Sequence, residues 1–505
     1  MKKKIYSKWI TILCVCSLIS CSDFLEESSL DEVKPSTVTD LEQLMLGEAY
    51  LGMNSIFDYI ELLTDNVESS FSTALGQEAC LRSGGAIFTW QPDMYEQMEL
   101  NGVVGRDTWQ NLYQKIKGCN VVLDMLDEVT GSKSDRLNLK GQALSLRAFY
   151  YFMLVNTYAL PYNAKGIDIE TALGVPLIIE ATVKDEFPIR ASVGDVYRQI
   201  EKDLLEAKLL MDQYGQANYQ YKVTPLFVDL LLSRMYLYME KWDQVVKYAS
   251  SVITQKPTLR KLSDYYRIVV DEWWGTETLT YDRDQAGVYN SDSPELIWGY
   301  GQSGSYGNYY VGIMNLMYEG NKPAFSVSQD LVNLYEAKDM RLHFYYEQYF
   351  IAMLYGVTAP LVGEKCKNDP RYNASRGMRV AEAYLNRAEA NIRLFLNNGD
   401  ENLRKAALRD LNYLREHRFE TSYEEVDKTG QELLDFCLAE RRRELSFEDH
   451  RWFDLRRLGM PEIKHQFTIS AGQTQEYVLP ANGARYVLPI PKVVLEKNPA
   501  LIQNP

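Results

Sequence analysis

The sequence predicts a mainly α-helical fold in which degenerate tetratricopeptide-like helix pairs form one large domain. An irregular, loop-rich insertion with minor β structure is expected to interrupt them. Three observations support this prediction. Apolar residues recur at helical spacing in several long stretches, two stretches carry the residue pattern of a repeat helix, and no linker divides the chain. A chain of 505 residues that is 46% hydrophobic can bury a large core, so residues 21–505 are expected to form a single domain.

The first residues have the pattern of a secretion signal. A lysine-rich start precedes an apolar run from Trp9 to Ile19, which is too short to span a bilayer. The run ends in Ser20 and Cys21, and a small residue directly before a cysteine is typical of a bacterial lipoprotein cleavage site. We therefore expect residues 1–20 to be removed and Cys21 to carry the lipid that holds the protein to a membrane.

Helical periodicity then recurs along the chain. It runs from Asp40 to Asp58, from Trp109 to Leu126 and from Leu139 to Tyr158. A further helix is expected to start at Ser192, because a serine before an acidic first turn caps a helix well. Its partner is expected to begin near Thr224-Pro225.

The repeat pattern itself appears twice. Between Val245 and Pro257, small and large residues and a closing proline fall where the second helix of a tetratricopeptide repeat has them. A second copy runs from Ala381 to Ala390, with a partner helix from Ala407 to Leu414. The glycine usual in the first helix of the repeat is absent from the first copy, so the repeat is degenerate.

The stretch from Gln431 to Gly459 combines an apolar stripe with dense charge. Apolar residues recur there at spacings of four, seven, seven and three, which places them on one side of one or two helices. They are Leu434, Leu438, Leu445, Trp452 and Leu455. We expect packing helices whose arginine side chains pair with carboxylates, ended by Gly459 and Pro461.

This stretch also carries a family resemblance. Residues 440–459, ERRRELSFEDHRWFDLRRLG, resemble the C-terminal signature of the SusD/RagB family of surface nutrient-binding lipoproteins. The closing residues 486–505, with PIP, NP and QNP in order, resemble the ending of that family, and residues 143–158 resemble its first helical pair. The resemblance covers essentially the whole chain after Cys21.

The resemblance implies a lipoprotein on the outer face of the outer membrane that is not an enzyme and needs no cofactor. It implies capture of an oligosaccharide and delivery to a SusC-like TonB-dependent transporter. Acidic residues close behind Cys21 resemble the family's signal for surface display. RagB-like members handle peptides, so a peptide ligand is the alternative, and a surface glycoside-degrading enzyme is a weaker one.

Two glycine-broken, aromatic segments are the candidate ligand-binding regions: residues 82–101, within an irregular stretch 65–105, and the insertion 258–375. The apolar face of a sugar ring stacks on Trp or Tyr, while neighbouring polar side chains bind its hydroxyls. We expect both segments to converge into one shallow aromatic surface. Its candidate residues are Trp90, Tyr95, Trp273, Trp274, Tyr306 and Tyr310.

No intact catalytic or metal-binding motif accompanies these rings. Residues 299–304 fit G-x-G-x-x-G, but residues 305–310 do not begin the helix that a dinucleotide site needs. Residues 282–287 imitate the start of a calcium loop, but Ala286 stands at its fifth position and Ser293 stands where the bidentate glutamate should be. The loop therefore has too few ligand oxygens, and only an unspecified calcium site is left open. Paired glycosidase carboxylates are defined by their separation in space, so the sequence also leaves that alternative open. We therefore assign no catalytic or metal-binding residue.

Net charge and cysteine content bear on the type of partner and on disulfide bonds. A net charge of −15 without a basic stripe argues against a nucleic-acid partner. Cysteines beyond Cys21 are scattered, so they predict no disulfide framework, and one pairing among them is left open. They are Cys80, Cys119, Cys366 and Cys437.

Overall fold

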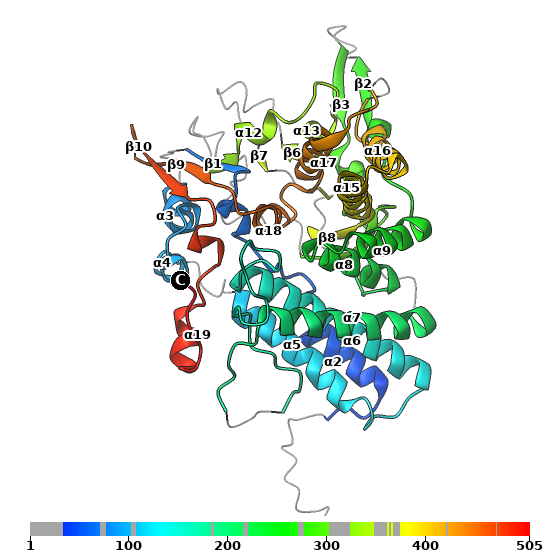
Figure 1. Ribbon diagram of the computed structural model, residues 1–505, viewed down its shortest axis with the longest axis vertical. Coiled ribbons are helices and arrows are strands. Elements are labelled where there is room, and N and C mark those ends of the chain that lie inside the picture. The colour runs from blue at the N-terminus through cyan, green and yellow to red at the C-terminus, as the bar shows by residue number, and fades with distance from the viewer. Residues whose placement is uncertain are drawn as a thin grey trace, which may run out of the picture.

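Most of the described chain is helical, which confirms the predicted fold class. A computed structural model describes residues 34–70, 77–102, 108–182, 186–215, 221–270, 277–301, 324–347, 361–362, 365–366, 374–420, 423–470 and 472–505. Figure 1 shows long helices in the lower and right-hand parts of the molecule and the strands mainly toward its upper end. No helix within these ranges is long and apolar enough to cross a membrane.

The lower part is a layer of long helices. It contains α2 (Val38–Glu48), α5 (Thr108–Met125), α6 (Lys133–Tyr158) and α7 (Val193–Tyr214), and α6 packs against both α5 and α7. The Ser192 hydroxyl accepts a hydrogen bond from the Asp195 N–H at 3.0 Å, so the predicted helix cap is confirmed. From Leu139 onward α6 is buried almost all round, which makes it the central helix of the layer.

The second helical layer brings the two repeat copies together. It contains α8 (Pro225–Tyr238), α9 (Trp242–Gln255), α15 (Val380–Asn398) and α16 (Glu401–Glu416). Helix α9 packs on both α8 and α15, although a long stretch of sequence separates it from α15. Ala249 and Ala388 are fully buried, as the small positions of a repeat require for close approach of helices.

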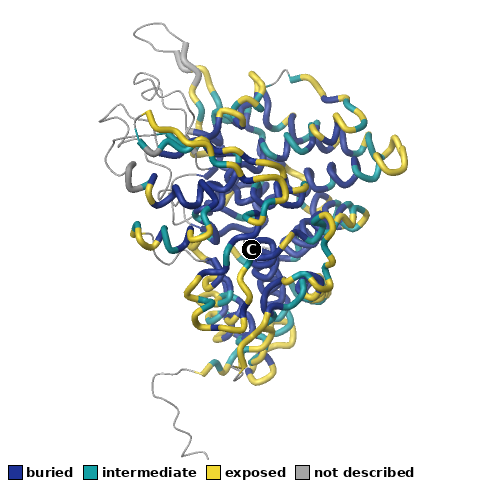
Figure 2. Tube along the Cα trace, turned by 60° about the vertical axis from the view of Figure 1, so that its left-hand side comes forward, coloured by how far each residue is buried: buried dark blue, intermediate teal, exposed yellow. Residues whose placement is uncertain are grey.

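The charged C-terminal stretch forms two helices, α17 (Gly430–Leu445) and α18 (Arg451–Arg457). Of the predicted apolar stripe, Leu434, Leu445, Trp452 and Leu455 are buried, and Leu438 is partly buried against the core. Figure 2 shows buried inner faces on the helices and exposed turns between them. The expectation of packing helices is therefore confirmed.

The strands pair two by two in antiparallel fashion among the described residues. The insertion contributes at least one strand to four of these five pairs, in agreement with the predicted minor β structure. The pairs are β1 (Val67–Ser69) with β5 (Phe325–Val327), β2 (Tyr266–Val270) with β3 (Glu277–Tyr281), β4 (Leu296–Tyr300) with β8 (Arg376–Arg379), β6 (Tyr346–Glu347) with β7 (Leu361–Val362), and β9 (Ile463–Ser470) with β10 (Gln473–Leu479).

Short helices and turns complete the described chain. They are α3 (Gln77–Phe88), α4 (Met94–Leu100), α10 (Arg283–Ala286), α12 (Gln329–Val332), α13 (Arg341–Phe344), α19 (Lys492–Lys497) and the 3-10 turns Ile60–Leu63, Leu262–Tyr265 and Ala484–Tyr486.

Two expectations about local structure are wrong. The stretch 65–105 is not irregular throughout, because α3 and α4 lie within it. Gly84 and Gly85 suggested a loop, but Gly85 lies inside α3, where an added Cβ would stand 2.7 Å from the Phe467 ring. The helix expected from Asp40 to Asp58 ends at Glu48, and Gly52 then takes a left-handed conformation at φ +57°.

Two of the cysteines are placed deep in the helical core. Cys119 on α5 and Cys437 on α17 are buried thiols. Burial raises the pKa of Cys119 to about 12 and that of Cys437 well above its usual value. Both side chains therefore act as small apolar groups in the core.

Candidate functional site

The predicted site residues divide into two groups. Trp90 and Tyr95 are described by the structure. Cys21, Trp273, Trp274, Tyr306 and Tyr310 lie outside the described residues. Their expected roles therefore stay predictions.

Trp90 is a core residue, which corrects the expectation that its ring is exposed. Its side chain is only 5% exposed, and its indole N–H donates to the Leu63 carbonyl at 3.0 Å. One face of the ring stacks on the His465 imidazole, with centroids 4.2 Å apart, and Phe88 stacks on the same imidazole at 4.0 Å. Because the indole N–H finds a partner inside the protein, burying this ring leaves no unpaired donor.

Tyr95 is buried as well, on α4 rather than on a loop. Its hydroxyl lies 2.8 Å from the Tyr59 hydroxyl and 3.0 Å from the Tyr158 hydroxyl, and the residue is 6% exposed. Burial, together with these two phenols, raises the pKa of Tyr95 well above its usual value. The ring is held in a buried polar chain and presents no face for stacking a sugar.

Described residues of the two aromatic segments do meet. Phe88, at the end of α3, contacts Phe325 on β5 with ring centroids 5.3 Å apart. Strand β5 follows directly on residues 302–323, which include Tyr306 and Tyr310, and it pairs with β1. The contact is between buried rings, so what it shows is a shared core, not a shared binding surface.

Two further strand pairs, β2 with β3 and β4 with β8, lie within or at the end of the insertion. Trp273 and Trp274 fall in the sequence between Val270 and Glu277, the last paired residues of β2 and β3. Strand β8 closes the insertion by pairing with β4, where Gly377 lies beside the Trp298 carbonyl so closely that a Cβ would stand 2.0 Å from the oxygen. Only glycine fits at that position.

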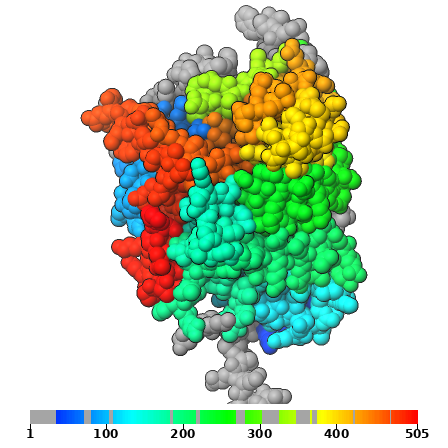
Figure 3. Space-filling model, in the orientation of Figure 1, coloured from blue at the N-terminus to red at the C-terminus, as the bar shows by residue number. Residues whose placement is uncertain are grey.

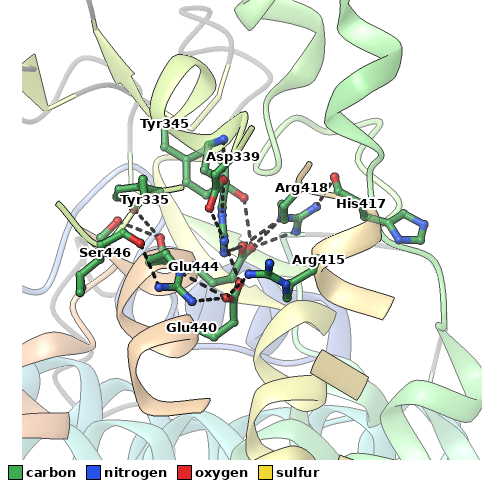
Figure 4. A network of polar contacts seen from close by, with 12 residues as sticks. Tyr335, Asp339, Tyr345, Arg415, His417, Arg418, Glu440, Glu444 and Ser446 are labelled. Atoms are coloured by element: carbon green, nitrogen blue, oxygen red, sulfur yellow. Dashed lines mark hydrogen bonds and ion pairs between the residues drawn. The ribbon is translucent and has the colours of Figure 1, made fainter. Parts of the chain in front are cut away.

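A buried network of ion pairs holds the insertion to α17. Glu440 and Glu444, one turn apart, point toward Arg415 and Arg418 at the end of α16 (Figure 4). The Glu444 carboxylate accepts from Arg341 at 3.1 Å and from Arg418 at 2.9 Å, and it also pairs with Arg379. Arg341 lies on α13 within the insertion, so the network joins the insertion to the C-terminal helices.

The network extends to the strand that closes the insertion. Glu295, directly before β4, accepts from Arg379 on β8 at 3.0 Å and from Arg418 at 2.8 Å. Glu448 accepts from Arg379 at 2.8 Å and from the Tyr289 hydroxyl at 2.6 Å. These groups are all buried, so each charge depends on the others for its compensation.

The network fixes the charge state of its carboxylates. Burial alone would raise the pKa of Glu444, but Arg418, Arg379 and Arg341 outweigh it and hold that pKa well below its usual range. In the same way, arginines led by Arg341 lower the pKa of Glu440 to about 2 against the effect of burial. A carboxylate locked in the ionised form cannot serve as a general acid.

Glu61 differs from these carboxylates. Burial, followed by the charge of Asp449, raises the pKa of Glu61 to about 7, and burial also raises the pKa of Asp449. Glu61 is 4% exposed, and one of its carboxylate oxygens has no hydrogen-bond partner among the residues that the structure describes. Among the described residues, Glu61 and Asp449 are therefore the two acids to mutate in a test of enzymatic activity.

A polar cavity of about 390 Å³ lies away from the insertion, between α2 and α6. Its described lining residues include Thr37, Glu42, Asp135, Asn138 and Gln142, and none of the described lining residues is aromatic. In Figure 1 these helices are at the lower end of the molecule, whereas β2 and β3 are at the top. Lacking any ring for stacking, this cavity does not match the aromatic surface that the sequence predicts.

Two family models match the chain at its two ends. The model described as "Starch-binding associating with outer membrane" matches residues 23–237, and the model described as "SusD family" matches residues 367–505. Residues 238–366 lie between the two matched ranges and contain most of the insertion. The matched ranges therefore hold the helical layers except α9 and the last residue of α8, and they hold the C-terminal part of the ion-pair network.

Individual relatives agree over the full length. "SusD-like protein P25" of Formosa agariphila is 21% identical, over 99% of this chain and 98% of its own. A solved putative sugar-binding protein from Bacteroides vulgatus is 23% identical with a TM-score of 0.65, over 94% of this chain and 99% of its own. A solved SusD superfamily protein from Bacteroides thetaiotaomicron is 20% identical with a TM-score of 0.64, over 93% and 100%. At these identities the solved structures show the shared fold.

Proposed function

Because this chain belongs to the SusD/RagB family, we propose that it is a surface lipoprotein that binds an oligosaccharide and delivers it to a SusC-like TonB-dependent transporter. The observation that carries the proposal is that the matches to a starch-binding, outer-membrane-associated family flank the aromatic insertion. Two family-matched ranges on either side of an aromatic, glycine-containing segment are expected in a binding protein whose ligand contacts lie on loops.

The chemistry of the described residues supports binding rather than catalysis. Arginines surround Glu440 and Glu444 on α17 and hold both carboxylates ionised, and we infer that these acids fix the insertion in place. Aromatic rings and polar groups on the insertion would supply stacking and hydrogen bonds, a combination that suits sugars. Binding through a few rings is expected to be weak, roughly micromolar to millimolar, which suits a protein that must release its cargo.

The decisive experiment measures binding and turnover together. We expect calorimetry with a panel of oligosaccharides and peptides to find a glycan ligand, and chromatography of the same mixtures to show no product. If only peptides bind, the ligand of this protein is a peptide and not an oligosaccharide. A product that appears with the wild type and disappears in both Glu61→Gln and Asp449→Asn would instead make the protein an enzyme.

The lipid anchor gives a separate prediction. Replacing Cys21 by alanine is expected to move the protein from the detergent phase to the aqueous phase, because the thiol is the attachment point of the lipid. Phase partitioning of whole-cell extracts measures this directly. A Cys80→Ala variant is the control and should stay in the detergent phase. Unchanged partitioning of Cys21→Ala would contradict the lipoprotein assignment.

A further inference from the structure

Arg456 on α18 is a buried positive charge that has no carboxylate partner among the described residues. It is 2% exposed, and its guanidinium Nη2 donates to the Ala159 carbonyl, just beyond the end of α6. Its Nε and Nη1 atoms are closed off from solvent, and neither has an acceptor in the described part of the chain. A buried guanidinium normally has its charge paired and its donors bonded, because an uncompensated buried charge is costly.

The other two arginines of α18 show what this position lacks. Arg451 donates to both carboxylate oxygens of Asp65 at 2.7 Å. Arg457 donates to Asp454 at 2.7 Å, so the acid that lies nearest to Arg456 in the sequence already has a partner. Within α18, Arg456 is therefore the arginine whose charge the described carboxylates leave uncompensated.

The ionisable groups around the Arg456 guanidinium are neutral. Those that act on its pKa are the phenols of Tyr197 on α7, Tyr238 on α8 and Tyr486 near the C-terminus, and no described carboxylate is among them. Burial raises the pKa of each phenol above its usual value, so all three are uncharged at neutral pH. Burial lowers the pKa of Arg456 only to about 10, so the guanidinium keeps its charge at that pH.

A second unpaired donor lies on the same side of α18. Trp452 is fully buried, and its indole N–H has no acceptor within the described ranges. Its ring stacks on Tyr486, with centroids 5.1 Å apart, and Tyr486 is one of the phenols near Arg456. Residues four apart lie on one side of a helix, so the unpaired donors of Trp452 and Arg456 belong to one region. N–H donors together with a positive charge are the groups that hold an anion.

Capping of α6 explains only part of this arrangement. The C-terminal end of a helix carries about half a negative charge, so an arginine there is favourable. Arg190 fills this role completely, because all three of its guanidinium nitrogens donate to carbonyl or amide oxygens, including the Tyr158 carbonyl at 2.9 Å. Arg456 brings a second full charge to the same helix end and leaves two of its three nitrogens unbonded within the described chain.

Two segments cover the end of α6. The Tyr158 carbonyl accepts from Arg190, on the connector 159–192, and from Asn504 of the C-terminal segment at 3.0 Å. Figure 3 shows the red C-terminal segment lying against the blue-green connector. An ion at the buried Arg456 side chain would therefore be enclosed by protein and would exchange slowly with solvent.

We propose that the side of α18 that carries Arg456 and Trp452 binds one small monovalent anion, chloride or an ion of similar size. One negative charge balances the one uncompensated guanidinium, and only a small ion can be enclosed among buried side chains. The bound ion ties α18 to the end of α6 and so joins the C-terminal helices to the lower helical layer. This inference is independent of the proposed function, because it concerns the scaffold and not the glycan.

The first experiment locates the ion in the wild-type protein. Because the region is enclosed, the full-length protein is unfolded in urea, refolded in sodium bromide and then crystallised, so that bromide replaces the bound ion. We expect an anomalous bromide peak beside Nε and Nη1 of Arg456. Density there without an anomalous signal would be a water molecule. That result, or no density at all, would overturn the proposal.

The second experiment measures how stability depends on the anion. Urea unfolding is followed at constant ionic strength while sodium chloride replaces sodium gluconate in tenfold steps. Once the site is saturated, an ion that leaves on unfolding raises the folding equilibrium constant tenfold per step, or about 1.4 kcal/mol. We expect this dependence in the wild type and its loss in Arg456→Met, which replaces the guanidinium by an unbranched apolar side chain.

Arg451→Met is the matched control on α18. It removes an arginine that is paired with Asp65, and Asp65 keeps Arg442 as a partner at 3.4 Å. This variant should keep the chloride dependence of the wild type. Equal chloride dependence in the wild type and Arg456→Met would show that any bromide seen is an adventitious ion only, and it would overturn the proposal. If Arg456→Met does not fold, the bromide experiment on the wild type decides alone.

Discussion

Replacing Glu444 by glutamine is expected to lower the free energy of unfolding by about 3–5 kcal/mol, because it leaves buried charges without their counter-ion. Arg341, Arg379 and Arg418 all pair with this carboxylate, and all three guanidinium groups are buried. Glutamine keeps the shape of the side chain and removes the charge. The loss would be measured as a lower urea midpoint with an unchanged slope, together with a lower melting temperature.

Glu432 provides a matched control on the same helix. It pairs with Lys428 at the surface, where its side chain is 69% exposed. Glu432→Gln should change stability by no more than about 0.5 kcal/mol, because exposed ion pairs contribute little. Equal effects of the two substitutions would show that the Glu444 network does not hold the insertion to α17.

Replacing Trp273 and Trp274 together by alanine is expected to abolish measurable ligand binding while moving the melting temperature little. Each ring is expected to contribute about 0.5–1.5 kcal/mol to stacking, so losing both would weaken binding by about 1–3 kcal/mol, roughly 5- to 150-fold. A ligand bound at millimolar concentrations would then lie beyond the limit of calorimetry, and one bound at micromolar concentrations would be measured as roughly 5- to 150-fold weaker. Titration of the glycan found with the wild type would measure it.

Trp90→Ala is the comparison variant for this experiment, because it removes a buried tryptophan. Because Trp90 is buried against His465 and bonded to Leu63, its loss should cost about 3–5 kcal/mol of stability, as is usual for a large core side chain. A double variant of Trp273 and Trp274 that behaves like Trp90→Ala, unstable but still able to bind, would place the ligand elsewhere.

The sequence by itself determined most of the long helices and several of their ends, although it missed α3 and α4. The Ser192 cap, the helix start at Pro225 and the apolar stripe of residues 431–459 depend on neighbours within a few residues, so the pattern along the chain was sufficient to predict them. The contact between the two repeat copies could not be predicted in this way. The sequence showed two copies, and the structure showed that α9 packs on α15.

Only the tertiary structure decided which aromatic and charged residues are buried. Trp90 appeared suited to a binding loop because the partner that buries it, His465, lies far away in the sequence. Gly85 suggested a loop for the same reason, since its need for a small residue comes from Phe467. The charges of α17 were expected to pair, but their partners Arg341, Arg379 and Arg418 come from separate elements. Helix periodicity and capping are local interactions, whereas burial and charge compensation depend on segments that meet only when the chain folds.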